Sequence, residues 1–149
     1  MKKIGEYPVK GRIDKLSDER ITLFDGRFDT GFRVVRFEIA AKDVATGADA
    51  YAKLTTEPID TTLFGDGDNW NWDSNVEIAW ARWVMAGPGT NGAADYFIDP
   101  DNMIVEDLYI YTGTADPNPA DVNYMIHLEK YDITDWQGAL AMVRNRSQT

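Results

Sequence analysis

The sequence predicts a mostly β protein: a single antiparallel β-sandwich or jelly-roll-like domain with a short C-terminal helix. Two observations lead to this fold class. Short apolar or alternating runs recur along the chain, and Gly, Pro, Asn and Asp separate them, which is the pattern of a sandwich or jelly roll. In addition, a chain of 149 residues has the usual size of one domain, and no longer internal repeat is apparent.

Six runs are predicted to be strands because β-branched and aromatic residues dominate them or alternate in them. They are residues 20–25, 32–39, 50–55, 76–84, 103–111 and 122–131. The run 76–84 also has helical spacing at some positions, but its residue types favour a strand. The segment 113–121 is predicted to be a loop because its two prolines cannot donate hydrogen bonds to a sheet.

The run 32–39 has the period-2 pattern of a half-buried strand. We expect its core face to carry Val35, Phe37 and Ile39. Val34 is expected on the solvent face, together with the charged side chains of the run.

The C-terminal residues 134–149 differ from the rest of the chain. Thr134 and Gln137 have the spacing of a capping box, and Trp136 begins an amphipathic helical pattern that continues to Val143. We expect a short helix with a basic tail. This segment and the N-terminal segment 1–18 are predicted to be interaction arms of the single domain 1–149.

The charge distribution of this acidic chain restricts its partners. The formal net charge is −10; residues 1–36 carry nine basic and six acidic groups, and residues 54–129 carry one basic and fourteen acidic groups. Such a middle region repels nucleic acid phosphates, so we expect no nucleic-acid partner. Two interpretations stay open: contacts between oppositely charged regions of neighbouring copies, or acidic loops that keep the protein soluble.

The expected location follows from what the sequence lacks. There are no cysteines, and no segment approaches the roughly 18–20 apolar residues that span a bilayer. The first residues have no apolar stretch of a signal peptide. We therefore expect synthesis in a cytoplasm and no membrane partner.

The sequence gives little support for catalysis. Its one histidine, His127, lies in a predicted strand, and no nucleophile elbow or nucleotide-binding signature occurs. Glycoside hydrolysis needs only two carboxylates, but the adjacent Glu106 and Asp107 would face opposite sides of a strand. Glu77 and Glu106 could meet, although the sequence does not show it. We predict that the chain is not an enzyme.

The segment 66–73 combines acidic and amide side chains with two tryptophans. Asp66, Asp68 and Asp73 are candidate calcium ligands, but Asn71 stands where an EF-hand loop needs glycine, so only an irregular calcium site is conceivable and no other cofactor is predicted. A turn-rich loop explains the same residues. Trp70 and Trp72 are a possible glycan platform, or else they fill a core or an interface.

Two segments resemble a known class of protein. The runs ITLFDGRFDTGFRVVRFEI (21–39) and VNYMIHLEKYDITDWQGALAMVRNRSQ (122–148) resemble small virion structural proteins of marine bacteriophages. The resemblance implies a capsid-associated, decoration or tail-associated protein that is present in many copies, has no enzymatic activity and is located in the virion after synthesis in the host cytoplasm. Its partners would be copies of itself and other virion proteins.

The sequence-based hypothesis is therefore a self-associating virion component. The alternative is a carbohydrate- or receptor-binding β-sandwich module that uses exposed tryptophans. For the first, the acidic loops 66–73 and 95–101 are predicted to meet basic contacts near the two ends of the chain. The predicted partner contacts are Lys2, Lys3, Lys10, Arg12, Trp136, Arg144 and Arg146.

Overall fold

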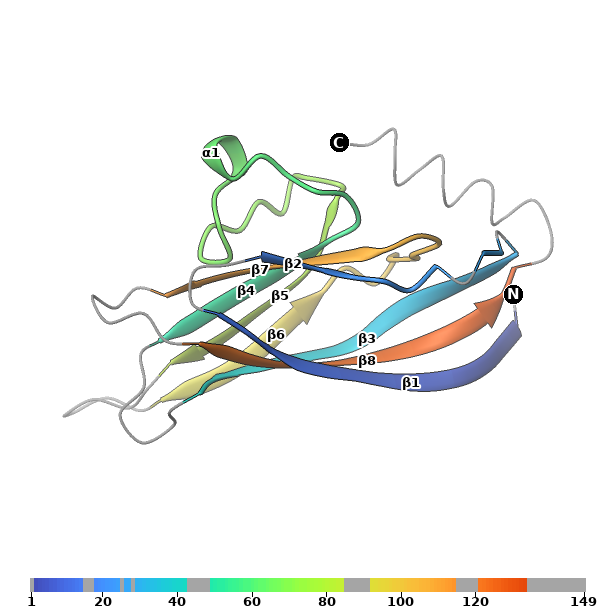
Figure 1. Cartoon of the computed structure of the whole chain (residues 1–149), viewed down its shortest axis with the longest axis horizontal. Helices are drawn as coiled ribbons and strands as arrows, with labels where there is room; N and C mark the ends of the chain where they lie inside the picture. The colour runs from blue at the N-terminus through green and yellow to red at the C-terminus, as the bar shows by residue number, and fades with distance from the viewer. Residues whose placement is uncertain are drawn as a thin grey trace.

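The computed structural model of the chain describes residues 2–14, 18–24, 26–27, 29–42, 49–84, 92–114 and 121–133. These residues form two antiparallel sheets in a sandwich-like arrangement, with one short helix (Figure 1). The prediction of a mostly β protein is thus confirmed. The predicted C-terminal helix, 134–149, lies outside the described residues. No helix in the described part of the chain is long and apolar enough to cross a membrane.

The first sheet has three strands in the order β1-β8-β3. β1 spans Lys2–Ile13, β8 spans Val122–Asp132 and β3 spans Thr30–Ala41. The central strand β8 pairs with β1 from Lys2 to Ile13. Most of the N-terminal segment that was predicted to be an arm is therefore an edge strand of the sandwich.

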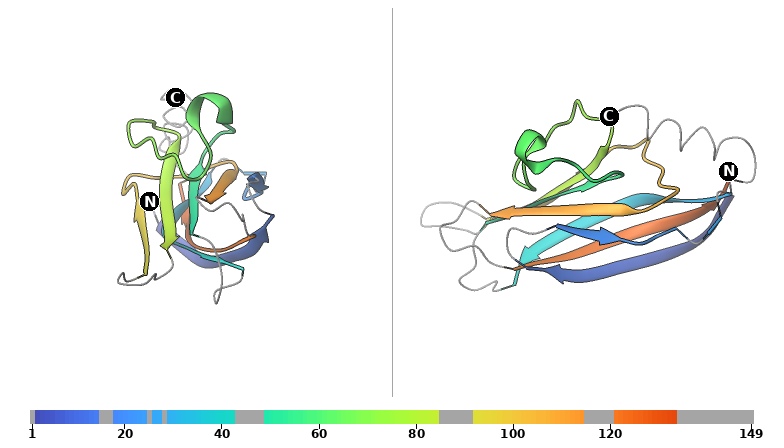
Figure 2. Two further views of the ribbon diagram at one scale, coloured as in Figure 1. Left: turned by 90° about the vertical axis from the view of Figure 1, so that its left-hand side faces the viewer. Right: turned by 45° about the horizontal axis from the view of Figure 1, so that its top comes forward.

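The second sheet has five strands in the order β2-β7-β4-β5-β6. Their bounds are Asp18–Ile21 for β2, Leu108–Thr114 for β7, Ala50–Thr55 for β4, Glu77–Val84 for β5 and Ala93–Ile98 for β6. The connection 56–76 between β4 and β5 contains the helix α1 (Thr61–Phe64). It lies over the face of the second sheet that points away from the first sheet (Figure 2).

The core lies between the two sheets, and β8 shows how the sequence pattern produces it. Val122, Tyr124, Ile126 and Leu128 alternate along this strand and are all buried. They pack in one cluster with apolar side chains of β3, β4, β5 and β7. Burial of such side chains contributes roughly 1.5–3 kcal/mol each, so this alternation is a main source of the stability of the sandwich.

The alternation predicted for β3 is wrong in its first half. Val34 is 1% exposed and Val35 is 41% exposed, the reverse of the expectation, whereas Phe37 and Ile39 are buried as expected. The pairing register with β8 shifts between Val34 and Arg36. This β-bulge adds one residue and exchanges the two faces of the strand, which a strict period of two cannot anticipate.

The predicted run 50–55 coincides with β4, whereas two other predicted strands are shifted at their boundaries. The run 20–25 is a strand only up to Ile21, and the run 103–111 becomes a strand only at Leu108. Residue Ile104 instead forms an isolated bridge with Phe32. The strands β1 and β6 were not predicted, because Gly5, Pro8 and Gly11 interrupt β1 and because β6 is short.

An ion pair fastens the short strand β2 to the start of β7. Arg20 donates from Nε to Oδ2 of Asp107 over 2.8 Å, and the backbone amides of Leu23 and Phe24 donate to Oδ1. Burial of Asp107 by itself raises its pKa, but these hydrogen bonds together outweigh burial and leave the pKa below its ordinary value. The charged carboxylate is therefore the form that stabilises this corner of the fold.

The bulge predicts opposite responses at two neighbouring valines. Val34→Ala should lower the free energy of unfolding by about 1.5–3 kcal/mol because it removes buried methyl groups and leaves a cavity. Val35→Ala, the matched control on the exposed face, should change it by less than about 0.5 kcal/mol. Urea unfolding measures both values, and an equal or larger loss for Val35→Ala would contradict the bulge.

Low pH should remove the contribution of the charged Asp107 side chain to the stability of the fold. Because the folded-state pKa is lowered, the stabilisation is present above the unfolded-state value of about 3.9 and is lost as the pH falls through the folded-state pKa. At pH 7, Asp107→Asn should cost about 1–3 kcal/mol. Unfolding curves at pH 7 and near pH 2.5 should show that the difference from the original protein shrinks in acid; a constant difference would speak against a charged Asp107.

Candidate binding groove

A buried ion pair between β4 and β5 organises the connection 56–76. The side chains of Lys53 and Glu77 are 0% and 1% exposed, and Nζ of Lys53 lies 3.0 Å from Oε2 of Glu77. The ammonium group also donates to the backbone carbonyls of Phe64 and Asn69, at 3.0 and 2.8 Å. All three of its donors are therefore used, and two of them bind the connection.

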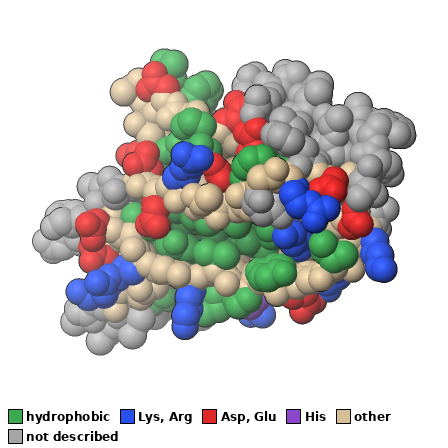
Figure 3. Space-filling view, turned by 45° about the vertical axis from the view of Figure 1, so that its right-hand side comes forward, with side chains coloured by type: hydrophobic (Ala, Val, Ile, Leu, Met, Phe, Trp, Pro, Cys, Tyr) green, Lys and Arg blue, Asp and Glu red, His purple; other side chains and the backbone are tan. Residues whose placement is uncertain are grey.

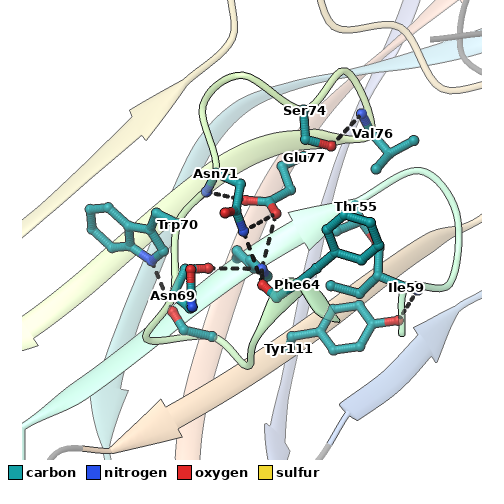
Figure 4. Close-up of polar contacts among 12 residues, drawn as sticks. Thr55, Ile59, Phe64, Asn69, Trp70, Asn71, Ser74, Val76, Glu77 and Tyr111 are labelled. Carbon is teal, nitrogen blue, oxygen red and sulfur yellow. Dashed lines mark hydrogen bonds and ion pairs between the residues drawn. The ribbon is translucent and has the colours of Figure 1, made fainter. Parts of the chain in front are cut away.

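Glu77 completes the network from the other side (Figure 4). Its Oε1 accepts a hydrogen bond from the Asn71 backbone amide, and its Oε2 accepts one from the Asn71 side-chain amide, both at 2.9 Å. Oε1 also accepts from the Trp80 indole at 3.0 Å. A buried ion pair is favourable only when its remaining donors and acceptors are satisfied, as they are here. Lys53 and Glu77 thus hold the connection against the sheet.

Two further contacts bring the connection close to β7. The Tyr111 hydroxyl accepts from the Ile59 backbone amide at 2.9 Å (Figure 4). A Cβ atom at Gly67 would lie 2.3 Å from the Tyr111 carbonyl oxygen, so the backbone approaches β7 as only glycine allows. The connection is therefore anchored on β4, β5 and β7.

The anchored connection presents Trp72 to solvent. Its side chain is 62% exposed, yet its ring contacts Trp80, with 5.5 Å between centroids, and Phe97, with 5.6 Å. Trp80 comes from β5 and Phe97 from β6, at directly paired positions of the sheet. Three aromatic rings from three parts of the chain thus form one cluster on the outer face of the second sheet.

A groove of about 450 Å³ lies at this cluster. Its size falls in the range of small-molecule sites, roughly 300–1,000 Å³. Besides the three rings, polar side chains and one aliphatic side chain line it. These are Ser74, Asn75, Glu77, Ile98 and Asp99.

The structure separates the two tryptophans of the predicted glycan platform. Trp72 lines the groove, whereas Trp70 is half-buried, donates from its indole to the Gly67 carbonyl over 2.8 Å and meets Phe97 edge-on. The second exposed ring of the groove is Phe97, which the sequence analysis did not single out. Through these contacts the acidic loops 66–73 and 95–101 lie next to each other.

The calcium candidates are not gathered into a site. Asp66, Asp68 and Asp73 are exposed. Within the described ranges, no group of three or more acidic or histidine side chains is placed to hold a metal ion. His127 is half-buried in the central strand of the first sheet, opposite Pro8 and Arg36.

Four of the predicted basic contacts, Lys2, Lys3, Lys10 and Arg12, lie on the edge strand β1, and two of them already have partners within the chain. Lys3 binds Glu129 at 2.7 Å, and Arg12 lies 3.8 Å from Asp121. The hydrogen bonds of Lys3 to Glu129 and Glu6 raise the pKa of its ammonium group. A partner would have to compete with these pairs. Trp136, Arg144 and Arg146 lie outside the described residues, and contact with a partner stays a prediction for all seven residues.

Comparison with known proteins gives no relative: no family model matches the chain, and no curated protein or solved structure has significant similarity to it.

Removal of one member of the buried ion pair should be costly. Lys53→Met leaves the Glu77 carboxylate buried without its cation, and the free energy of unfolding should fall by about 3–5 kcal/mol. Protease cleavage within 56–76 should also become faster, because two carbonyls of the connection lose their donor.

The control is Arg82→Met, which removes an exposed ion pair with Asp95 from the neighbouring strand β5. It should change stability much less than Lys53→Met. In the double variant Lys53→Met/Glu77→Gln, the loss should be smaller than the sum of the single losses, as a double-mutant cycle measures. Additive losses would show that the two side chains do not act as a pair.

Proposed function

We propose that the chain is a non-enzymatic virion structural protein with a jelly-roll fold that associates with copies of itself. In a jelly roll the first half of the chain pairs with the second half in reverse order. The pairs β1–β8, β2–β7 and β4–β5 follow this order, and β3 contacts β6. Viral capsid and lectin domains use this architecture. The resemblance of residues 21–39 and 122–148 to phage virion proteins favours the first of these two classes.

The observation that supports self-association is that the edge strands of the two sheets differ in their protection against pairing with another chain. A free edge pairs readily with another chain unless charged residues, proline, short length or a covering segment prevents it. On β1, Pro8 removes one donor, and Glu6 and Lys10 place charged side chains on either side of it. The edge strand β2 has only four residues, three of them charged.

The edge of β3 is covered by other parts of the chain. The backbones of Phe32 and Ile104 exchange two hydrogen bonds of 2.7 Å. The Asn102 side chain then continues this pairing: its oxygen accepts from the Val34 amide at 2.8 Å, and its nitrogen donates to the Val34 carbonyl at 3.1 Å. Asn102 thus takes the place of a neighbouring strand.

In the described part of the chain, β3 packs close to the edge of β6 but forms no strand pairing with it, so this edge is the least protected of the four. Its sequence, AADYFI, contains neither lysine nor proline, and its one charged residue, Asp95, is paired with Arg82 over 2.7 Å. Ala93, Ala94, Tyr96 and Phe97 are exposed. Among the described residues, β6 has a strand partner only on its β5 side. An antiparallel β6–β6 contact would join two copies by a two-fold axis.

The surface also offers apolar area for contacts. Figure 3 shows hydrophobic side chains in a band across one face, with charged side chains around it. Continuous apolar area of this kind is typical of interaction surfaces.

A non-enzymatic role is supported by Glu77, because both oxygens of this groove carboxylate already accept hydrogen bonds and its charge is neutralised by Lys53.

Sedimentation velocity over a range of concentrations tests the proposal. We expect the full chain to form dimers or larger species and Ala94→Lys, which places a charge on the β6 edge, to weaken association at least tenfold. Asn123→Lys is the matched control, since it adds the same charge at an exposed position of the central strand β8. Self-association through β6 is wrong if the chain is monomeric throughout or if both variants behave alike.

A second measurement addresses the virion. Mass spectrometry of purified particles from the virus that encodes the chain should detect it in many copies per particle. Detection only in lysates of infected cells, and not in particles, would contradict a structural role in the virion.

A further inference from the structure

We propose that the groove at Trp72 binds neutral glycans. This binding is a separate activity from self-association, since it uses the outer face of the second sheet and not the backbone edge of β6. Trp72, Trp80 and Phe97 supply the apolar contacts, and Asn75 and Asp99 supply polar groups beside them.

The aromatic cluster has the shape that a sugar ring requires. A pyranose has apolar C–H groups on its ring faces and hydroxyl groups around its rim, so it packs against a flat aromatic ring. Trp72 offers such a ring because most of its surface is exposed while Trp80 and Phe97 support it from the protein side. Rings held in this way lose little conformational entropy when a ligand binds.

The polar groups of the groove suit hydroxyl recognition. Asp99 is half-buried at the end of β6, where its Oδ1 accepts from the Asp101 backbone amide at 3.0 Å, which fixes the carboxylate in place. Asn75 is exposed and carries both a donor and an acceptor. A sugar hydroxyl can donate a hydrogen bond to the Asp99 carboxylate. It can either donate to or accept from the side-chain amide of Asn75.

Charge selects neutral glycans over acidic ones. Both charged residues that line the groove, Glu77 and Asp99, are acidic, and Lys53 neutralises only the first of them. Asp73 and Asp101 are exposed nearby in sequence. Sulfated or carboxylated sugars would meet this negative potential at close range, so their binding should be weaker.

The anchoring network makes the groove a preformed site. Glu77 binds the indole of Trp80 on one side and the Asn71 backbone on the other, and Asn71 is the residue before Trp72. The same buried carboxylate therefore fixes the floor of the groove and the position of its exposed ring. A site that is rigid before the ligand arrives binds with a smaller entropy cost.

Titration calorimetry with the full chain tests the proposal. The probes are cellohexaose, maltohexaose, chitohexaose and mannohexaose as neutral glycans, and a heparin hexasaccharide as the acidic one. At least one neutral probe should bind, and Trp72→Ala and Phe97→Ala should each weaken its binding about tenfold. The matched control is Tyr7→Ala, which removes an exposed ring from β1 of the other sheet and should leave binding unchanged.

Asn75→Ala, an exposed change outside the aromatic cluster, keeps the test valid if an aromatic variant fails to fold; it should weaken binding severalfold. The proposal is overturned if no neutral probe binds, if Trp72→Ala binds like the original protein, or if the heparin hexasaccharide binds more tightly than every neutral one. Sedimentation of the same samples separates the two proposals, because Trp72→Ala should leave self-association intact.

Discussion

The contact between Lys53 and Glu77 determines what the outer face of the second sheet can do. Alternation along β4 places Lys53 on the face that points away from the core, and the register shift between β4 and β5 brings Glu77 to the same face, where water would normally hydrate both side chains. The connection 56–76 covers them instead, and its backbone supplies the hydrogen bonds that these two desolvated charged groups need. The ion pair and the covering segment thus depend on each other, since neither has an adequate environment without the other.

This dependence explains why a long irregular segment can hold a well-defined aromatic surface. The only helix of the connection, α1, has four residues, and none of its side chains is buried. Regular structure therefore contributes little to the position of Trp72. Fixed points at Asn69, Asn71 and Tyr111 contribute more, because each connects backbone of the segment to a strand beneath it.

The sequence predicts those parts of the fold in which one physical signal dominates. β8 was predicted nearly to its bounds because four buried apolar residues alternate without interruption, and β5 because aromatic and β-branched residues outweigh a partly helical spacing. The β3 pattern failed at Val34 and Val35 because a bulge depends on the partner strand as well as on local sequence. β1 was not predicted, because its glycines and its proline, which suit an edge strand, are also typical of loops.

For the candidate groove, sequence reasoning found Trp72 by its unusual surroundings but grouped it with Trp70, which does not line the groove, and not with Phe97, which does. Trp70 is two residues away in the chain, whereas Phe97 reaches Trp72 only through the pairing of β5 with β6. Lys53 did carry a signal, since it is the only basic residue between Lys42 and Arg82 in a strongly acidic region. Sequence alone could not identify its partner among so many carboxylates.

The alternation of β5 also separates core packing from ligand binding, two tasks that compete in many proteins. Ala79 and Ala81 point into the core, and Trp80 between them points outward to the groove. Substitutions on the outward side leave the packing between the sheets untouched. The groove is therefore a surface on which new ligand preferences can arise by mutation while the scaffold below keeps its architecture.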